Sequence, residues 1–350
     1  MTFVSFRALP RPAAVRHVVR LAIAAALACI AAAPVSAQDA GSRRPELARL
    51  AVGSQHACAV RGDGAIACWG RNTHGQLGDG TTQDRTSPVL VVGSSGLLDG
   101  FVSVAAGASH TCGLRLDGTV FCWGSDLSGQ LGNGAGTLQR PYAMGVDNIA
   151  DAVSITAGRE HTCAVRAIGE VWCWGVNDRR QLGNNEPTNV LATRPVNVWN
   201  LTDVVSASAG GDHTCAVRAN GQIACWGRSD LGQLGNGSPN DTGVPVTVSG
   251  ISTATDVAAG GVHTCARLLD GAVRCWGFNN WRQLGTSSVG YTLTPVLASV
   301  GATATDVAGS ANTVCARLGD GGVRCWGDNR TGQLGDGTVS QRTGPVDVVW

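Results

Sequence analysis

Short apolar stretches, separated by Gly, Pro and Asp, run along most of the chain. In one such segment they predict three strands, at Val102–Ala106, His110–Arg115 and Thr119–Trp123, and a weaker fourth strand after Pro141. Outside the first 37 residues no window has the periodicity of an amphipathic helix. The pattern therefore predicts an all-β protein.

The same pattern recurs six times. Each unit of about 51 residues has two cysteines ten positions apart, a Trp-Gly pair, a Gln-Leu-Gly corner and a Pro before the last apolar stretch. Units of four short strands at this period predict a β-propeller with six four-stranded blades, and a seven-bladed ring is less favoured. An open solenoid would need polar capping units, so we expect ring closure, which removes exposed sheet edges.

The cysteine spacing defines a hairpin. Cys112 and Cys122 can face each other only across a loop with an odd number of residues, and Leu116-Asp117-Gly118 is such a loop. Its third position needs a positive φ, and every unit has Gly there. The resulting pairing places the two cysteines in a non-hydrogen-bonded pair, where Cα atoms lie about 4.5 Å apart.

We therefore predict one disulfide in each blade. An 11-residue loop contributes about 2.5 to 3 kcal/mol on the chain-entropy model. The predicted pairs are Cys58 with Cys68, Cys112 with Cys122, Cys163 with Cys173, Cys215 with Cys225, Cys265 with Cys275, and Cys315 with Cys325.

The N-terminal region predicts export from the cytoplasm, where cysteines can form disulfides. Residues 1–37 contain four Arg, an apolar run and a small-residue cleavage site before Gln38. This pattern predicts a secretory signal peptide. Its apolar run is too short to span a membrane. We expect a linker at 38–46, a propeller at 47–350, and a secreted or periplasmic protein with disulfides. Lipid attachment at Cys29 is a disfavoured alternative, because apolar residues continue past it.

Charge argues against a nucleic-acid partner. The formal net charge is +1, and removal of the four leader arginines makes it −3. The chain lacks both a strongly positive balance and a basic stripe. We expect no nucleic-acid partner, no membrane span and a monomer.

A His two residues before the first cysteine in five units raises the alternative of a metal site. Zinc sites usually have four ligands and closely spaced cysteines, so we expect no metal and no cofactor. The histidines are expected to hydrogen-bond backbone groups between blades. The Trp-Gly tryptophans are expected in the core, with each indole N–H donating to a carbonyl.

The sequence contains no strong enzyme motif. There is no lysine for a phosphate-binding loop and no nucleophile elbow. The acids Asp63, Asp117, Asp270 and Asp320 occupy hairpin positions that favour Asp for turn reasons. A carbohydrate-active or other envelope enzyme that uses the propeller mouth stays an alternative.

The recurring His-Thr-Cys, Asp-Gly, Trp-Gly and Gln-Leu-Gly elements closely resemble the repeat of the regulator of chromosome condensation family over Leu47 to Trp350. The resemblance implies a propeller, commonly seven-bladed, and functions that include nucleotide exchange on a small GTPase, light sensing and, in a secreted bacterial member, β-lactamase inhibition. The leader contradicts GTPase exchange. The sequence departs from the family's pattern in three ways. Only six units are visible, Arg180 and Arg282 replace the Gly before Gln-Leu-Gly, and Thr286-Ser287 replaces the usual Asn/Asp-Gly.

The resemblance and the leader together predict an extracytoplasmic protein-binding scaffold, inhibitor-like and without catalysis. Contact residues are expected where the units differ, and exposed aromatics often anchor interfaces. Inter-blade packing is an alternative role for the two unusual tryptophans. The candidates for partner binding are Trp199, Trp281, Tyr142, Tyr291, Arg85, Arg140, Arg194 and Arg342.

Overall fold

The computed structural model describes residues 49–136, 139–188 and 191–350. The predicted leader, its Cys29 and the linker lie outside these residues. Within them the chain forms twenty-six β-strands, all of them short, and no helix that is long and apolar enough to cross a membrane. The strands assemble into six separate sheets, each made by one repeat unit.

The strand boundaries follow the repeat. Blade 1 contains β1 (Leu50–Val52), β2 (His56–Val60), β3 (Ile66–Gly70) and β4 (Arg85–Leu90). Blade 2 contains β7 (Phe101–Ala106), β8 (His110–Arg115), β9 (Val120–Gly124) and β10 (Arg140–Gly145). Blade 3 contains β11 (Ala152–Ala157), β12 (His161–Arg166), β13 (Val171–Gly175) and β14 (Ala192–Asn197).

The second half of the chain repeats this order. Blade 4 contains β15 (Val204–Ala209), β16 (His213–Arg218), β17 (Ile223–Gly227) and β18 (Thr242–Thr247). Blade 5 contains β19 (Ala254–Ala259), β20 (His263–Leu268), β21 (Val273–Phe278) and β22 (Tyr291–Leu297). Blade 6 contains β23 (Ala304–Gly309), β24 (Thr313–Leu318), β25 (Val323–Gly327) and β26 (Val346–Asp347).

Six four-stranded antiparallel blades are thus confirmed, with one addition. The segment between blades 1 and 2 forms a small hairpin of β5 (Val92–Gly93) and β6 (Gly96–Leu97). Strand β5 pairs in parallel with β10, so the sheet of blade 2 has six strands. The longest interval between successive units, from Cys58 to Cys112, provides the residues for this hairpin.

The predicted hairpin register is confirmed in all six blades. Cys112 lies opposite Cys122 and Leu114 opposite Val120, and the loop glycine Gly118 has φ 85°. The six cysteine pairs are at disulfide distance, with S–S separations of 2.09 to 2.14 Å and Cα separations of 4.0 to 4.1 Å. Their side chains are buried, so each bridge is part of its blade's core.

Both faces of blades 2 to 5 are covered by neighbouring blades. Trp123, Trp174, Trp226, Trp276 and Trp326 are fully buried. Each of these indole N–H groups donates to the backbone carbonyl of the Gln in the preceding blade's Gln-Leu-Gly corner, at 2.9 to 3.0 Å. The expected role of these tryptophans is confirmed for blades 2 to 6.

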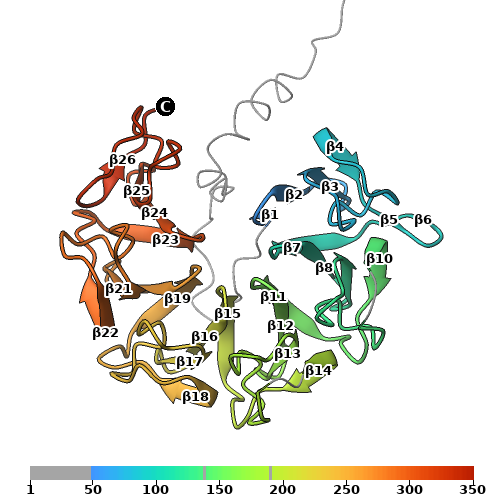
Figure 1. The fold of residues 1–350 in the computed structure, drawn as a ribbon, viewed down its shortest axis with the longest axis horizontal. Coiled ribbons are helices and arrows are strands. Elements are labelled where there is room, and N and C mark those ends of the chain that lie inside the picture. Colours follow the sequence, from blue (N-terminus) through green and yellow to red (C-terminus); the bar gives the residue numbers. More distant parts are fainter. Residues whose placement is uncertain (1–48, 137–138, 189–190) are drawn as a thin grey trace, which may run out of the picture.

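The blades are arranged around a common centre, with their first strands inside and their fourth strands outside (Figure 1). Consecutive blades pack together from blade 1 to blade 6. The expected direct closure is not seen: Figure 1 shows blades 1 and 6 apart, and no hydrogen bond or ion pair within the described ranges joins them. In blade 1 Ala57 replaces the Thr, and in blade 6 Thr313 replaces the His, of the recurring His-Thr-Cys element.

Candidate functional site

The recurring histidines connect blades. The Nε2 atom of His110 lies 2.9 Å from the hydroxyl of Thr162 in the next blade, and that hydroxyl donates to the carbonyl of Gln130 at 3.1 Å. His56, His161 and His213 make the same contact at 2.8 to 2.9 Å. Since the threonine donates to the carbonyl, the histidine Nε2–H must donate to the threonine. The partner is therefore a threonine side chain, not the backbone group that we expected.

Burial keeps these rings neutral. It lowers the pKa of His56, His161 and His263 to about 4, and that of His110 and His213 to about 3. Among the described residues no three His, Cys, Asp or Glu side chains are placed to hold a metal ion. The cysteine sulfurs form disulfides and four of the rings bond threonines, so the recurring residues form the framework of the fold.

One inter-blade link is missing. Blade 6 has Val314 where the other blades that follow a His have Thr, and the Nε2 atom of His263 is buried without a partner in the described part of the chain.

We expect Val314→Thr to raise the free energy of unfolding by about 1 kcal/mol, because the new hydroxyl can accept from His263 and donate to the Gln283 carbonyl. Thr214→Val, which creates the same defect at His161, should instead lower it by about 1 to 3 kcal/mol. Urea denaturation measures both, and equal effects of the two variants would contradict this assignment.

The partner-binding candidates gather on the outer rim, which we define as the fourth strands and the connections from the third strands to them. Seven of the eight lie there, and Trp199 lies in the turn that follows β14. Three arginines of the rim make local ion pairs: Arg85 with Asp79 at 2.8 Å, Arg194 with Asp147 at 2.8 Å, and Arg342 with Asp336 at 2.5 Å. The fourth, Arg140, has a buried Nε atom with no partner in the described ranges.

The two unusual tryptophans differ in exposure. Trp281 is half-buried, and the Arg330 guanidinium of blade 6 lies 4.0 Å from the centre of its ring, which is a cation–π contact between blades. Trp199 is 49% exposed and Tyr291 is 52% exposed. Trp281 therefore packs between blades, whereas Trp199 and Tyr291 are available to a partner.

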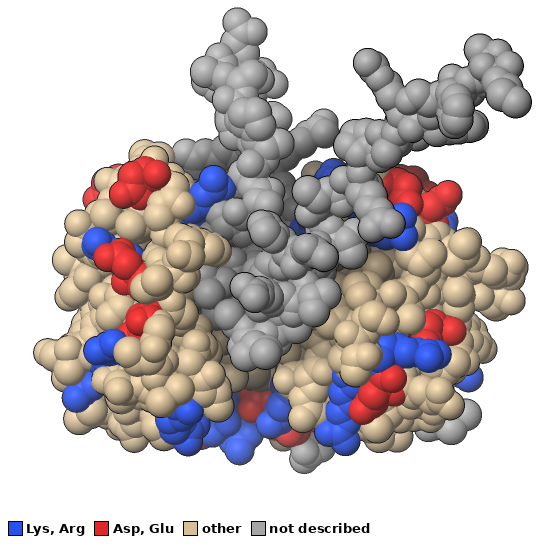
Figure 2. Space-filling model, turned by 90° about the horizontal axis from the view of Figure 1, so that it is seen from above, with Lys and Arg blue, Asp and Glu red and all other residues tan. Residues whose placement is uncertain are grey.

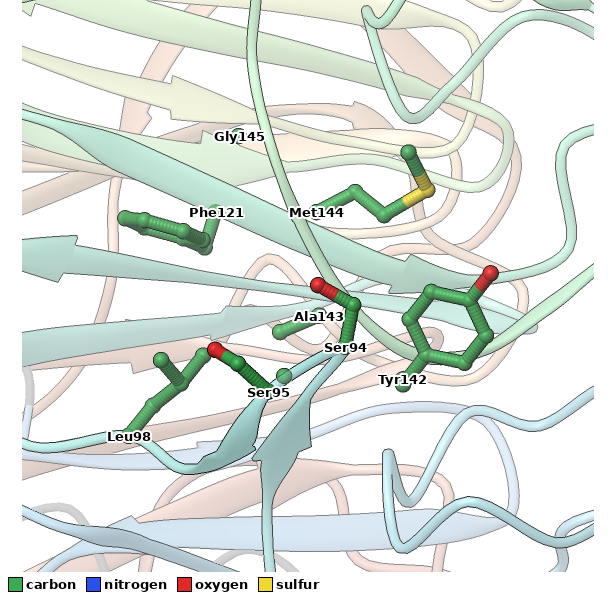
Figure 3. Close-up of a pocket in the computed structure, with 9 residues that line it drawn as sticks. Ser94, Ser95, Leu98, Phe121, Tyr142, Ala143, Met144 and Gly145 are labelled. Carbon is green, nitrogen blue, oxygen red and sulfur yellow. The ribbon is translucent and has the colours of Figure 1, made fainter.

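Tyr142 borders a recess that the β5–β6 hairpin creates against blade 2 (Figure 3). The cavity has a volume of about 270 Å³. Phe121, Leu98 and Met144 supply its apolar wall, and Ser94 and Ser95 carry hydroxyl groups at its edge. The recess has no counterpart in the prediction, because the sequence pattern did not reveal the extra hairpin.

Sequence reasoning also missed a group of charges between blades 3 and 4. The Asp212 carboxylate is buried, 2.7 Å from Arg159 and 3.4 Å from Arg228, and Arg228 also pairs with Asp230 at 2.7 Å. Burial raises the pKa of Asp212, while the two arginines oppose this rise. The available signal was Arg159, because the other five units have Ser, Ala or Gly at its position.

The visible described surface has no area dominated by one sign of charge. Figure 2 shows basic and acidic side chains next to one another, separated by uncharged residues.

Two rim arginines have a strained backbone. Arg180 has φ 65° and Arg282 has φ 64°, whereas the other four units have Gly at this position with φ of 72 to 80°. A left-handed conformation costs a non-glycine residue about 1 kcal/mol. A Cβ atom on Gly243 of the next blade would lie 3.6 Å from the Arg180 side chain, and at the matching positions of blades 1 and 2 a Cβ on Gly75 or Gly129 would meet Pro141 or Thr193. The chain thus accommodates a large side chain at a position shaped for glycine.

The hairpin acids have the expected turn role. The carboxylates of Asp63, Asp117, Asp270 and Asp320 accept from the backbone N–H two residues later, at 2.8 to 3.1 Å.

A different carboxyl pair lies on the innermost strands of blades 5 and 6. Burial and the neighbouring Asp306 raise the pKa of Asp256 to about 7. The pairing of β19 and β20 places Arg267 opposite Asp256, and its positive charge opposes that rise.

Comparisons with known proteins agree with this architecture. Residues 29–300 match the RCC1-like domain, and residues 304–333 match the regulator of chromosome condensation (RCC1) repeat. The chain is similar to the probable E3 ubiquitin-protein ligase HERC4 of Mus musculus, with 34% identity over 58% of this chain and 19% of the ligase. It is also similar to the ultraviolet-B receptor UVR8 of Arabidopsis thaliana, with 33% identity over 56% of this chain and 44% of the receptor. The matches span less than half of either relative.

Two solved structures share the fold at 20% sequence identity. Yeast RCC1 (Prp20), solved with Kap60 bound, has a TM-score of 0.76 over 86% of this chain and 74% of its own. Human WBSCR16 has a TM-score of 0.77 over 86% of this chain and 81% of its own. Both structures share the propeller fold with this chain. The extent of the domain match establishes that the chain belongs to the RCC1-like domain family.

Proposed function

We propose that this protein is an extracytoplasmic protein-binding scaffold of the inhibitor-like kind, secreted or periplasmic in a bacterium, without catalysis of its own. Six disulfides favour an oxidising compartment. Residues 1–37 have the composition of a secretory leader. A disulfide-bonded propeller of this family is suited to hold a fixed binding surface outside the cytoplasm.

The observation that carries the proposal is the strained pair Arg180 and Arg282. Both occupy a glycine position on the outer rim, and both therefore lower the stability of the fold. Arg180 makes no ion pair with the described residues. Arg282 donates to the Ser287 carbonyl of its own connection, so Arg180 has the less engaged side chain of the two. A strained backbone at a glycine position favours a role in binding, and a guanidinium suits the carboxylates and backbone carbonyls of a protein partner.

The recurring residues support the absence of catalysis. The buried histidines are neutral, and four of them donate Nε2–H to a threonine. The hairpin carboxylates accept hydrogen bonds from their own turns. Neither set combines a general base with an accessible nucleophile.

We expect Arg180→Gly combined with Arg282→Gly to weaken capture of a protein partner from envelope extract at least tenfold. The substitutions restore the residue of the other four units, so the thermal midpoint should stay the same or rise, with about 0.5 to 1 kcal/mol of relieved strain per site. Affinity capture under oxidising conditions and calorimetry measure the two quantities.

Two further variants locate the surface. Trp281→Ala should also weaken capture, because it removes the ring that supports Arg330. Leu116→Ser, at a hairpin tip that is 83% exposed, should leave it unchanged. Undiminished capture by the double glycine variant, or a loss confined to Leu116→Ser, would refute the proposed rim surface.

A further inference from the structure

The recess beside Tyr142 exists because blade 2 lacks a proline that the other five blades share. In those blades a Pro lies immediately before the residue opposite the second cysteine, and a Pro has no N–H with which to pair a further strand at the outer edge. These residues are Pro88, Pro195, Pro245, Pro295 and Pro345. Blade 2 has Ala143 at this position, and Ala143 pairs with Gly93 of β5. The β5–β6 hairpin is therefore held by an edge that the other blades block.

The recess is open because residue 145 is a glycine. Gly145 lies opposite Phe121, so a side chain at residue 145 would stand beside the Phe121 ring. A Cβ atom on Gly145 would have no neighbouring atom within 4 Å. The matching residues of the other blades all carry larger side chains: Leu90, Asn197, Thr247, Leu297 and Asp347. Blade 2 thus keeps open a space next to its third strand.

The aromatic wall of the recess is fixed in place. The guanidinium of Arg115 lies 4.7 Å from the centre of the Phe121 ring. The Phe101 ring packs edge-on against Phe121, with 6.0 Å between the ring centres. Leu98, which follows β6, lines the recess together with Phe121 (Figure 3). A ligand would meet a wall that is already in position, which lowers the entropic cost of binding.

The polar groups of the recess are uncharged hydroxyls. Ser94 and Ser95 form the turn of the β5–β6 hairpin, and their hydroxyls, like that of Tyr142, make no hydrogen bond to the described residues. None of the nine described residues that line the recess carries a charge. A charged ligand would lose hydration without gaining an opposite charge, whereas a ligand hydroxyl could bond to a serine.

The backbone beside the recess suits a free molecule better than a peptide strand. Strand β6 is only two residues long, Gly96 and Leu97. On β10, Pro141 has no N–H to offer beyond the pairing of Ala143 with β5. An extended peptide would therefore find few backbone partners at this edge.

We propose that the recess binds a small, uncharged aromatic molecule that carries a hydroxyl group. Its volume of about 270 Å³ lies just below the usual range for small-molecule sites, about 300 to 1,000 Å³, so it suits one ring or two fused rings. The ring of the ligand would pack against Phe121, and its hydroxyl would bond to Ser94 or Ser95. The site lies on blade 2, whereas Arg180 and Arg282 lie on blades 3 and 5, so it goes beyond the function proposed above and does not depend on it.

Fluorine NMR can report on the recess directly. Labelling of the full chain with 4-fluorophenylalanine gives five signals, from Phe3, Phe6, Phe101, Phe121 and Phe278, and Phe121→Leu identifies the signal of Phe121. Titration of the oxidised protein with 2-naphthol should shift the Phe121 signal saturably, with a dissociation constant of about 0.1 to 1 mM. The Phe278 signal, from blade 5, is the internal control and should not move. 2-Naphthoate, which has the same rings and a charge, should bind about tenfold more weakly.

Two variants test the contacts. Gly145→Leu fills the recess and should weaken the binding of 2-naphthol about tenfold, whereas Gly344→Leu, at another glycine with open space around it, should leave the affinity unchanged. Ser94→Ala combined with Ser95→Ala should weaken the binding about fivefold and leave the thermal midpoint unchanged. A Phe121 signal that stays in place throughout the titration, an affinity that neither variant lowers, or equal binding of 2-naphthoate would overturn the proposal.

Discussion

Reduction of the six disulfides should unfold the protein at neutral pH and 37 °C. Each bridge closes a loop of the same length and contributes about 2.5 to 3 kcal/mol on the chain-entropy model. Together the six bridges are comparable to the whole stability of an ordinary domain, about 5 to 15 kcal/mol. Urea titrations of fully oxidised protein and of protein refolded in a reductant measure the difference.

A single-blade variant provides the matched control. Cys112→Ala combined with Cys122→Ala should cost about 3 kcal/mol, and the corresponding pair in blade 4, Cys215 and Cys225, should cost the same, because both loops have identical length. Reduced protein that is as stable as oxidised protein would show that the bridges contribute nothing. A cost confined to one blade would show that local packing, not loop closure, determines it.

Lowering the pH from 7.0 to 5.5 should remove about 5 kcal/mol from the free energy of unfolding. Five buried histidines have a pKa of about 3 to 4 in the folded protein, against 6.5 when unfolded. Below pH 6.5 the unfolded state binds protons that the folded state does not, so stability falls as the pH falls. At pH 5.5 each histidine costs about 1.4 kcal/mol, or about 7 kcal/mol for all five.

The Asp256 and Asp306 pair acts in the opposite direction. The pKa of Asp256 is raised to about 7, so the folded state binds a proton there that the unfolded state has lost above about pH 4. Over the same interval this pair adds back about 2 kcal/mol. Chemical denaturation at the two pH values measures the net change. In His110→Gln the slope of stability against pH should decrease by about one fifth of the histidine contribution, and equal stability at both pH values would contradict the buried neutral histidines.

The sequence was sufficient to predict the interior of each blade. The ten-residue cysteine spacing, the loop glycine and the odd loop length together determine the register, because a one-residue slip would turn both cysteines to opposite faces. The carbonyl partner of each core indole could also be predicted in kind, since a buried N–H must be satisfied.

Contacts between blades were harder to predict. A residue that recurs in every unit can touch its own blade or the next one, and the repeat alone does not distinguish them. The His110 to Thr162 bond is such a case. The units that depart from the repeat indicate which contacts cross between blades. In blade 6 Thr313 and Val314 replace the recurring His and Thr, and in blade 1 Ala57 replaces the Thr. These substitutions mark the interfaces where the bond is not made.

The candidate site was predictable only as a region. The segments that differ between units do form the outer rim, but their ion pairs depend on side-chain geometry. Arg85 and Arg342 are held by an Asp six residues earlier, and Trp281 is covered by Arg330 of the next blade. Arg180 and Arg282 became candidates for partner binding only because the structure shows their strained, left-handed backbone.

The most direct test of the account is peptide mapping by mass spectrometry, without reduction, of the full-length chain recovered from the medium or periplasm of a bacterial expression host. The account predicts an N-terminus at Gln38 and six bridges, each joining cysteines ten positions apart within one blade. Free thiols at these twelve positions, or protein that retains Met1 and stays in the cytoplasm, would contradict an exported, disulfide-bonded scaffold.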